Sequence, residues 1–287
     1  MMAATPRTLL DGLAFPECPR WRDGALYFSD MHAGVVWKLT PDGGATRVLE
    51  LESQPGGLGW SPDGTLHVVS MHERKLFRFT GGKLIQHADM SSFTPSQTND
   101  MVMDREGRAY IGNFGFDLHN GATACSTMLL CVEPDGRVHS AAQELWFPNG
   151  MVITQDEKTL IVAETFAGKL TAFDIETSGA LTNRRVFAKL GADDAKIYPD
   201  GICLDSEGGV WVTCPTSNKI LRVDATGAVT HDTPLPGRDS FACMLGGADR
   251  RDLYICTSAH GPPTETVTAR SGRIEVMRVD VPGAGLP

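Results

Sequence analysis

The sequence predicts an all-β fold, a six-bladed β-propeller with four-stranded blades around a central channel. Segments that alternate apolar and polar residues dominate the chain, and long segments with helical periodicity are absent. One unit recurs six times, with copies starting near Pro16, Pro55, Thr98, Pro148, Pro199 and Phe241. The copies are roughly 40–50 residues apart, which is the length of a propeller blade. A two-sheet sandwich is the alternative, but six similar units favour the propeller.

Each unit contains four expected strands in order, of which the first lies on the axis. The second strands are the clearest and follow turns rich in Asp or Gly: "GALYFSD", "GTLHVVS", "GRAYIGN", "KTLIVAE", "GGVWVTC" and "RDLYICT". A third strand and a weaker fourth strand complete each unit. The leftover segment "RTLL" (7–10) is expected to supply the outer strand of the last blade and to close the ring. We therefore expect one propeller domain over residues 1–287.

The composition is that of a soluble globular protein, with 41% hydrophobic and 21% charged residues. A net charge of −9 argues against nucleic acid and anionic membrane surfaces as partners. The seven cysteines form no CxxC pair and no Cys/His cluster at zinc spacing, so we expect reduced thiols in a cytoplasmic protein. No stretch resembles a signal peptide or is long enough to span a bilayer.

Aligned copies place one residue of each blade at the start of its inner strand. These axial positions are Glu17, Gly56, Asn99, Asn149, Asp200 and Ala242. Inner strands run along the channel, so the axial side chains converge at one end of it. Carboxylate and amide oxygens without thiolate or imidazole suit Ca²⁺ or Mg²⁺, with Mn²⁺ possible and Zn²⁺ tolerated. Asn or Asp before Gly is also common in turns, but the shared register favours a site.

The loops between the second and third strands reach the same end of the channel. They are expected to bring Asp30, Asn113 and Glu164 to that face, and the long loops 114–127 and 258–272 could form a lid or a pocket wall. Aromatic residues flank the axial positions, and they either line an apolar pocket or pack between blades: Phe15, Trp146, Phe147, Tyr198 and Phe241.

Four segments resemble the sugar-lactone lactonases, the family of gluconolactonase, regucalcin and luciferin-regenerating enzyme. They are "FPECPRWRDGALYFSD", "NDMVMDREGRAYIGN", "FPNGMVITQDEKTLIVAET" and "YPDGICLDSEGGVWVT". The resemblance covers nearly the whole chain and implies one divalent cation in the channel, most often Ca²⁺. By motif it implies that Glu17, Asn149 and Asp200 are the metal ligands and that Asp200 is also the catalytic acid/base.

The resemblance also implies substrate-binding positions. Asn99, in "TND", matches an asparagine that contacts substrate, and Asp117 falls where the family often has a substrate-binding glutamate. Gln97 departs from the family, which typically has arginine there, because a neutral amide lacks the charge and the forked donor geometry. The family's "NDG" also reads "NDM" here. These departures predict a lactone or ester that is less hydroxylated and bulkier than gluconolactone.

The predicted activity is that of a metal-dependent lactonase or carboxylic-ester hydrolase acting through metal-activated water. Asp200 would transfer the proton, while Asn99 and Gln97 orient the substrate. The alternatives are phosphotriesterase-like hydrolysis, a lyase or isomerase reaction at the same site, or a propeller that binds a ligand without catalysis. A general base at His72 or His260 and a nucleophilic Cys18 are weaker alternatives. We expect a monomer or small homo-oligomer that takes a small-molecule substrate.

Overall fold

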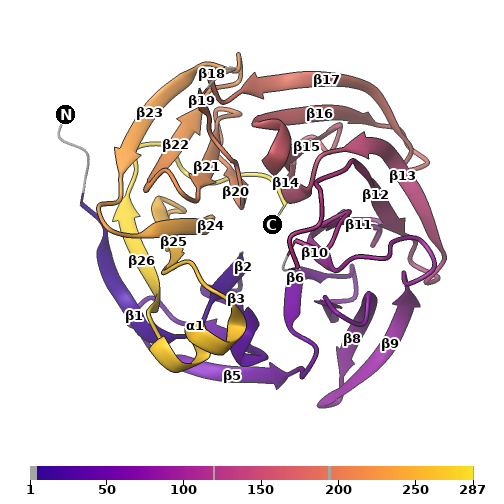
Figure 1. Ribbon diagram of the computed structural model, residues 1–287, viewed down its shortest axis with the longest axis horizontal. Helices are drawn as coiled ribbons and strands as arrows, with labels where there is room; N and C mark the ends of the chain where they lie inside the picture. The colour runs from indigo at the N-terminus through magenta and orange to yellow at the C-terminus, as the bar shows by residue number, and fades with distance from the viewer. Residues whose placement is uncertain (1–4, 119, 193–194, 287) are drawn as a thin grey trace.

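The chain forms six four-stranded antiparallel sheets arranged in a ring (Figure 1). The computed structural model describes residues 5–118, 120–192 and 195–286. The six sheets correspond to the six sequence repeats, so the prediction of a six-bladed β-propeller with four-stranded blades is confirmed. Two short strands, β18 (Gly191–Ala192) and β19 (Ala195–Lys196), form a further small sheet before the fifth blade.

Within blades one to five the strands follow chain order from the axis outward. Blade one contains β2 (Pro16–Arg22), β3 (Ala25–Asp30), β4 (Val35–Leu39) and β5 (Ala45–Glu50). Blade two contains β6 (Pro55–Trp60), β7 (Leu66–Ser70), β8 (Lys75–Thr80) and β9 (Lys83–Asp89). Blade three contains β10 (Thr98–Met103), β11 (Ala109–Asn113), β12 (Thr127–Val132) and β13 (Val138–Leu145). Blade four contains β14 (Pro148–Ile153), β15 (Thr159–Glu164), β16 (Lys169–Ile175) and β17 (Leu181–Lys189). Blade five contains β20 (Ile202–Leu204), β21 (Val210–Cys214), β22 (Lys219–Val223) and β23 (Val229–Pro234).

The sixth blade joins the two ends of the chain. Its inner strands are β24 (Asp239–Gly246), β25 (Asp252–Ser258) and β26 (Gly272–Arg278), and its outer strand is β1 (Arg7–Leu13). The indigo β1 therefore lies beside the yellow β26 in Figure 1. Because one sheet holds both the first and the last strand, the ring is closed by backbone hydrogen bonds and leaves no unpaired strand between its first and last blades.

Short helical segments occupy three of the connections. The 3₁₀ helices η1 (Met31–Ala33) and η2 (Thr165–Ala167) follow the second strands of blades one and four. The α-helix α1 (Pro263–Ala269) lies in the long loop before β26, where Thr266 Oγ1 is 2.6 Å from His32 Nδ1 of η1. The loop 258–272 is thus held against the first blade.

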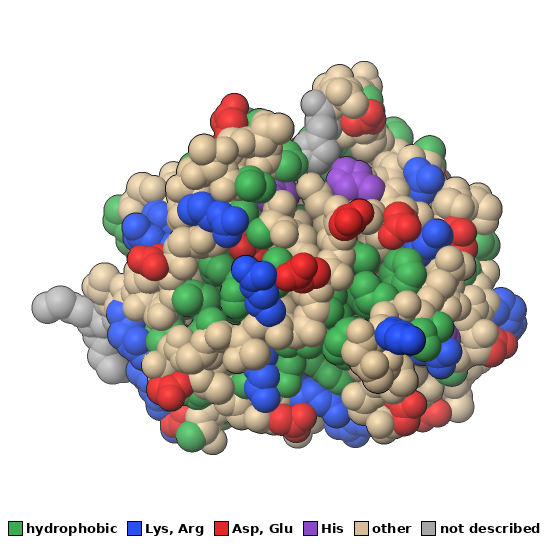
Figure 2. Space-filling model, turned by 90° about the horizontal axis from the view of Figure 1, so that it is seen from below, with side chains coloured by type: hydrophobic (Ala, Val, Ile, Leu, Met, Phe, Trp, Pro, Cys, Tyr) green, Lys and Arg blue, Asp and Glu red, His purple; other side chains and the backbone are tan. Residues whose placement is uncertain are grey.

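The core lies on the inner strands and between neighbouring blades. Every residue of β10 and β14 is buried, whereas β5 and β23 are mostly exposed. Aromatic side chains pack at the junction of blades one and six, where the rings of Trp21 and Tyr254 stack with their centroids 5.4 Å apart. Figure 2 shows acidic and basic side chains interspersed on one side of the molecule. The inner strands are buried and the outer strands are exposed, which explains why the inner strands are mostly apolar in sequence.

The C-terminal segment crosses one end of the axis (Figure 1). Leu286 pairs with Ile153, the last residue of β14, and Gly283 pairs with Asp205, just after β20. Ser206 N–H donates to Pro282 O at 2.8 Å. The segment thus covers the end of the axis where the inner strands finish, while the predicted axial residues lie at the opposite end.

The structure shows the state of the cysteines and the character of the helices. All seven cysteines are in the described ranges, none is in a disulfide, and only Cys125 is exposed. Burial, together with the charges of Asp100 and Glu17, raises the pKa of the Cys18 thiol well above its usual range, which disfavours it as a nucleophile. Within the described ranges no helix has the length and apolar character needed to cross a membrane.

Candidate functional site at the start of the inner strands

A β-bulge recurs where the inner strands begin. In blade one Glu17 pairs with Ser29 and Arg20 pairs with Tyr27, so three steps along β2 match two along β3. The same displacement occurs between Pro55 and Leu58, Thr98 and Met101, Pro148 and Met151, and Ser240 and Ala242. A bulge interrupts the alternation of side chains and increases the local twist. It allows side chains near the start of an inner strand to turn toward the axis.

Glycines after two axial residues let neighbouring inner strands approach closely. A Cβ atom at Gly150 would lie 2.6 Å from Ile202 N, and one at Gly201 would lie 2.5 Å from Ala242 Cα. The motifs "PNG" and "PDG" are therefore explained by contact between blades, because a side chain at either glycine would collide with the next strand. Asn149 lies inside β14, which makes the turn interpretation of "PNG" wrong.

The predicted axial residues are all buried at this end of the axis. Glu17, Asn99, Asn149 and Asp200 are each no more than 9% exposed. Asn99 Nδ2 donates to Asn149 Oδ1 at 3.1 Å, and Asn149 Nδ2 donates to Thr165 Oγ1 at 3.2 Å. Thr165 in turn donates to Pro199 O at 2.8 Å. This chain of hydrogen bonds fixes the orientation of the Asn149 amide.

The two axial carboxylates are in an environment that opposes their ionisation. Burial raises the pKa of Glu17 to about 8, and the charge of Asp100 adds to the increase. Burial likewise raises the pKa of Asp200 well above its usual range, and the charges of Glu17 and Asp100 raise it further. A bound cation would reverse both effects, since it favours the charged form of each acid.

Arg20 and Asp100 form a buried ion pair beside the axial residues that the sequence analysis missed. Arg20 Nη2 lies 2.6 Å from Asp100 Oδ1, and Arg20 Nε donates to Leu58 O at 3.1 Å. Arg20 also donates to the carbonyl of Met101. The guanidinium thus joins blades one, two and three. One feature of the sequence pointed to this pair: in "TND", Asp100 occupies the position that is glycine in blades four and five.

Within the set of Glu17, Asp100, Asp200 and Arg20, the charges do not cancel once both axial acids are ionised. When ionised, the carboxylates of Glu17, Asp100 and Asp200 carry three negative charges, and Arg20 supplies one positive charge. Two negative charges remain, which one divalent cation would neutralise. Because uncompensated buried charge is costly, the residue set fits a doubly charged cation.

The loop residues expected at this face have structural roles. Asp30 accepts hydrogen bonds from the backbone N–H of Ala14 and Phe15, at 3.0 and 2.7 Å. Glu164 is fully buried, accepts from Trp146 N–H at 2.9 Å and pairs with Arg184 at 3.2 Å. Asn113 donates to Met128 O at 2.7 Å. These side chains hold the chain around the starts of the inner strands.

Gln97 and Asp117 lie in one pocket of about 420 Å³, whose lining residues do not include the axial residues. Its walls are formed by His72, Arg74, Pro95, Ser96, Gln97, Phe116, Asp117, Leu118 and Asn120. Gln97 Nε2 is 2.8 Å from His72 Nδ1, and Asn120 Nδ2 donates to Asp117 Oδ2 at 2.8 Å. The expectation that loop 114–127 forms a pocket wall is confirmed for the described residues of that loop.

Two groups of aromatic rings surround the starts of the inner strands. In the first group Phe147 stacks on Phe114 at 4.5 Å, and Phe166 contacts both Phe147 at 5.3 Å and Tyr198 at 6.0 Å. The second group is centred on Phe15, whose ring stacks on His32 at 4.4 Å and contacts Phe241 at 4.5 Å. Phe147 and Phe241 are buried, whereas Phe15 and Phe166 keep part of their surface exposed and Tyr198 is exposed. The rings therefore pack on one another and also offer apolar surface at this end of the molecule.

Known proteins share this fold and parts of this sequence. The chain is 29% identical over 182 residues to regucalcin of Danio rerio, which is 63% of this chain and 60% of that protein. It is 26% identical over 277 residues to 6-deoxy-6-sulfogluconolactonase of Pseudomonas putida, covering 94% of this chain and 93% of that protein. The crystal structure of a calcium-binding protein, regucalcin, from Agrobacterium tumefaciens strain C58 superposes with a TM-score of 0.82 at 21% identity, covering 99% and 97% of the two chains.

The family assignment rests on a longer match. Residues 15–260 match the family described as the SMP-30/Gluconolactonase/LRE-like region. That range contains the four segments that carried the resemblance in the sequence, and it includes most of the chain. The chain therefore belongs to the SMP-30/gluconolactonase/LRE-like family.

Proposed function

We propose that this chain is a lactonase that depends on one divalent cation held at the axial site. The observation that carries the proposal is the burial of two acids, Glu17 and Asp200, at one end of the axis beside Asn149, where the charge of Glu17 raises the pKa of Asp200. Family membership supports lactone hydrolysis, since the Pseudomonas putida relative is named a lactonase. What we propose beyond lactone hydrolysis is the dependence on a cation, the roles of the individual residues and the class of lactone.

Glu17, Asn149 and Asp200 would hold the cation. Their donor atoms are carboxylate and amide oxygens, and the surplus of two negative charges matches a divalent ion. Ca²⁺ is the first choice, because flexible oxygen ligands suit it and because the Agrobacterium relative is described as calcium-binding. Mg²⁺, Mn²⁺ and Zn²⁺ are alternatives. When bound, such a cation polarises a lactone carbonyl and lowers the pKa of a water molecule.

We assign proton transfer to Asp200, whose buried carboxyl lies at the axial site beside Asn149. In lactone hydrolysis the water oxygen attacks the carbonyl carbon, the ring C–O bond breaks, and a proton moves from the water to the leaving alkoxide. The Asp200 carboxylate accepts that proton and then donates it to the alkoxide, so the product is a hydroxy acid. Asn99, fixed by its hydrogen bond to Asn149, orients the substrate oxygens.

The substrate we propose is a lactone with an apolar or aromatic substituent and few hydroxyl groups. The family resemblance implies an arginine at position 97, which would bind a polyhydroxylated substrate through charge-assisted hydrogen bonds. In this chain Gln97 offers an amide there beside the imidazole of His72, and the guanidinium in the pocket is that of Arg74. Phe116 connects the wall of the pocket to the ring of Phe166, at 5.4 Å between centroids. A substituent leaving the axial site toward blades three and four would meet these rings.

Activity measurements with defined metal content test the proposal. The chain would be treated with a chelator, then given Ca²⁺, Mg²⁺, Mn²⁺ or Zn²⁺, and assayed with gluconolactone, an aryl-substituted lactone, an aryl ester and a phosphotriester. We expect chelation to abolish lactone hydrolysis and one cation to restore it. Asp200→Asn should lower kcat by a factor of about 10²–10⁴, whereas the exposed control Glu52→Gln should not.

The same panel separates lactone hydrolysis from two of the alternatives, phosphotriester hydrolysis and ligand binding without catalysis. Full lactone hydrolysis by Asp200→Asn or by the chelated chain would overturn the proposal. Faster turnover of the phosphotriester would favour phosphotriesterase-like chemistry at the same site. Cation binding without turnover of any compound would favour a propeller that binds a ligand without catalysis.

A further inference from the structure

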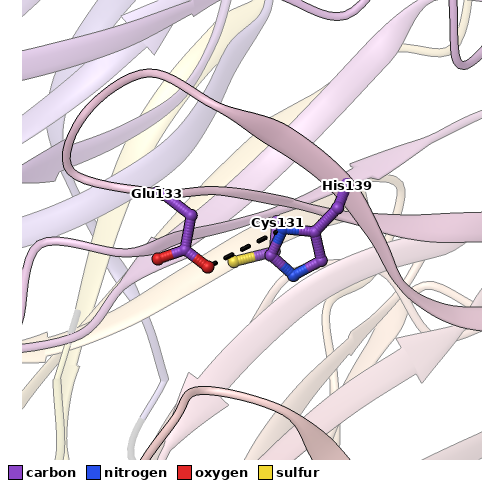
Figure 3. A group of neighbouring side chains, drawn as sticks. All are labelled: Cys131, Glu133 and His139. Carbon is purple, nitrogen blue, oxygen red and sulfur yellow. Dashed lines mark ion pairs between the residues drawn. The ribbon is translucent and has the colours of Figure 1, made fainter.

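Three side chains that bind zinc in other proteins gather on the outer part of the third blade (Figure 3). Cys131 lies on β12 and His139 lies directly opposite it on β13. Glu133 follows two residues after Cys131, at the hairpin turn. The thiol sulfur, a carboxylate oxygen and a ring nitrogen all lie within 4.8 Å of one another.

This cluster cannot be recognised from sequence spacing. The segment "CVEPDGRVH" has neither a CxxC pair nor paired histidines, so the sequence analysis found no zinc spacing there. The backbone of Glu133 and Arg137 closes the turn with a hydrogen bond of 2.9 Å, which places the ligand-bearing residues of β12 and β13 side by side. The search for zinc spacing along the sequence therefore did not identify this hairpin as a candidate site.

We propose that Cys131, Glu133 and His139 form a zinc site with three protein ligands and a fourth position open to water. His139 Nδ1 is 3.7 Å from Glu133 Oε1, too far for a hydrogen bond. Two ligand atoms on one tetrahedral zinc ion are separated by about 3.5 Å. Thiolate, imidazole and carboxylate together suit Zn²⁺, whereas the axial site offers oxygen atoms from carboxylates and an amide.

The surroundings of the cluster allow entry of an ion from one side. Cys131 is 1% exposed and packs in a cluster with Tyr110 and Leu129, while the side chains of Glu133 and His139 are 18% and 43% exposed. The hairpin is fixed by the sheet, so the ligands are brought together before an ion binds. Both strands are the outer two of their blade, which separates this site from the axial residues on the inner strands.

Binding would release a proton from the thiol. Burial raises the pKa of Cys131 to about 12, with the charges of Glu133 and Asp104 adding to the increase and that of Arg108 opposing it. The thiol is therefore protonated in the ion-free chain, and zinc affinity should increase with pH. A bound ion would stabilise the folded chain, because the unfolded chain does not hold the three ligands together.

Cobalt substitution tests the site with a readout other than hydrolysis. The full chain, saturated with Ca²⁺ to fill the axial site, would be titrated with Co²⁺ and then with Zn²⁺. We expect a thiolate-to-cobalt charge-transfer absorption that Zn²⁺ displaces. His139→Ala and Cys131→Ser should remove the absorption and weaken Zn²⁺ binding by at least about ten-fold.

Matched variants provide the controls. His231→Ala removes an exposed histidine from another outer strand, and Cys125→Ser removes the exposed cysteine. Both should keep the absorption and the Zn²⁺ affinity. His139 is partly exposed, so its variant reports on the site even if Cys131→Ser fails to fold. The absence of the absorption from the unaltered chain, or its persistence in His139→Ala, would overturn the proposal.

Discussion

Arg20 Nη2 lies 2.6 Å from Asp100 Oδ1, and this buried pair joins the first blade to the third across the inner strand of the second. Arg20 is 3% exposed and Asp100 is 5% exposed. The pair lies next to the axial acids, where Arg20 lowers the pKa of Glu17 and Asp100 raises it. It therefore links the packing of three blades to the electrostatics of the proposed cation site.

We expect Arg20→Met to lower the free energy of unfolding by about 3–5 kcal/mol, because Asp100 would be left as a buried charge without its partner. Urea unfolding followed by tryptophan fluorescence measures this change. Asp100→Leu should also destabilise the chain, and the double variant should lose less than the sum of the two single losses. Losses that simply add would show that the two side chains do not depend on each other.

Removal of divalent ions should make stability decrease as the pH rises. The pKa of Glu17 is raised from 4.5 to about 8 in the folded, ion-free chain. Between these values the unfolded state has lost the Glu17 proton while the folded state keeps it, so the contribution of Glu17 to the free energy of unfolding falls as the pH increases and levels off above about 8. Added Ca²⁺ should stabilise the chain more at the upper end of this range, since it binds the ionised acids.

Thermal unfolding with chelator and with Ca²⁺, at several pH values, measures this dependence. Glu17→Gln should flatten the curve obtained with chelator, because its side chain does not titrate. Glu52→Gln, on an exposed carboxylate, should leave the curve unchanged. Because His67 has the opposite effect below pH 6.5, the test is the difference between the two chains: a chelated wild-type chain whose stability changes with pH between 4.5 and 8 as that of Glu17→Gln does would contradict the expectation.

The repeat made both the fold and the location of the axial residues predictable. Alternating strands at blade spacing define the architecture, and the shared register of Glu17, Asn149 and Asp200 places them at one end of the axis. Gln97 was identified from the family resemblance alone, and Asp117 from the resemblance and from its place in a loop at the same end of the channel. Local sequence patterns were sufficient because each of these positions depends on the geometry of a single repeated unit.

Contacts between blades were not predictable in the same way. The ion pair of Arg20 and Asp100 spans 80 positions in the sequence, and its existence depends on how closely three inner strands approach. The close approach of Gly150 to the next blade depends on the same spacing, so the sequence left a turn open as the alternative interpretation of "PNG". Cys131 and His139 meet because of the pairing register of a hairpin, and a shift by one residue would place them on opposite faces.

A buried histidine on the second blade should make the chain sensitive to acid. His67 is 3% exposed, its ring is 5.2 Å from that of His87, and burial together with the charge of His87 lowers its pKa from 6.5 to about 4. As the pH falls through this interval, the unfolded state binds a proton that the folded state does not, so the free energy of unfolding decreases.

We expect His67→Gln to lose part of its stability at neutral pH but to show a shallower decline in acid than the unaltered chain. Urea unfolding of both chains at pH values from 4 to 6.5 gives the difference. His231→Gln, on an exposed strand position, is the control and should follow the unaltered chain. Parallel curves for His67→Gln and the unaltered chain would show that His67 does not cause the decline.

The residue at position 97 should set the preference between substrates. Gln97→Arg would add a second guanidinium, besides that of Arg74, to the pocket lined by Asp117, with donors for the hydroxyl groups of a sugar lactone. We expect kcat/KM for gluconolactone to increase about ten-fold relative to that for an aryl-substituted lactone, which corresponds to about 1.4 kcal/mol of transition-state stabilisation. Gln97→Met, which keeps the length of the side chain but removes the amide, should not produce this shift. An equal change for both lactones in Gln97→Arg would show that position 97 affects the site without selecting the substrate.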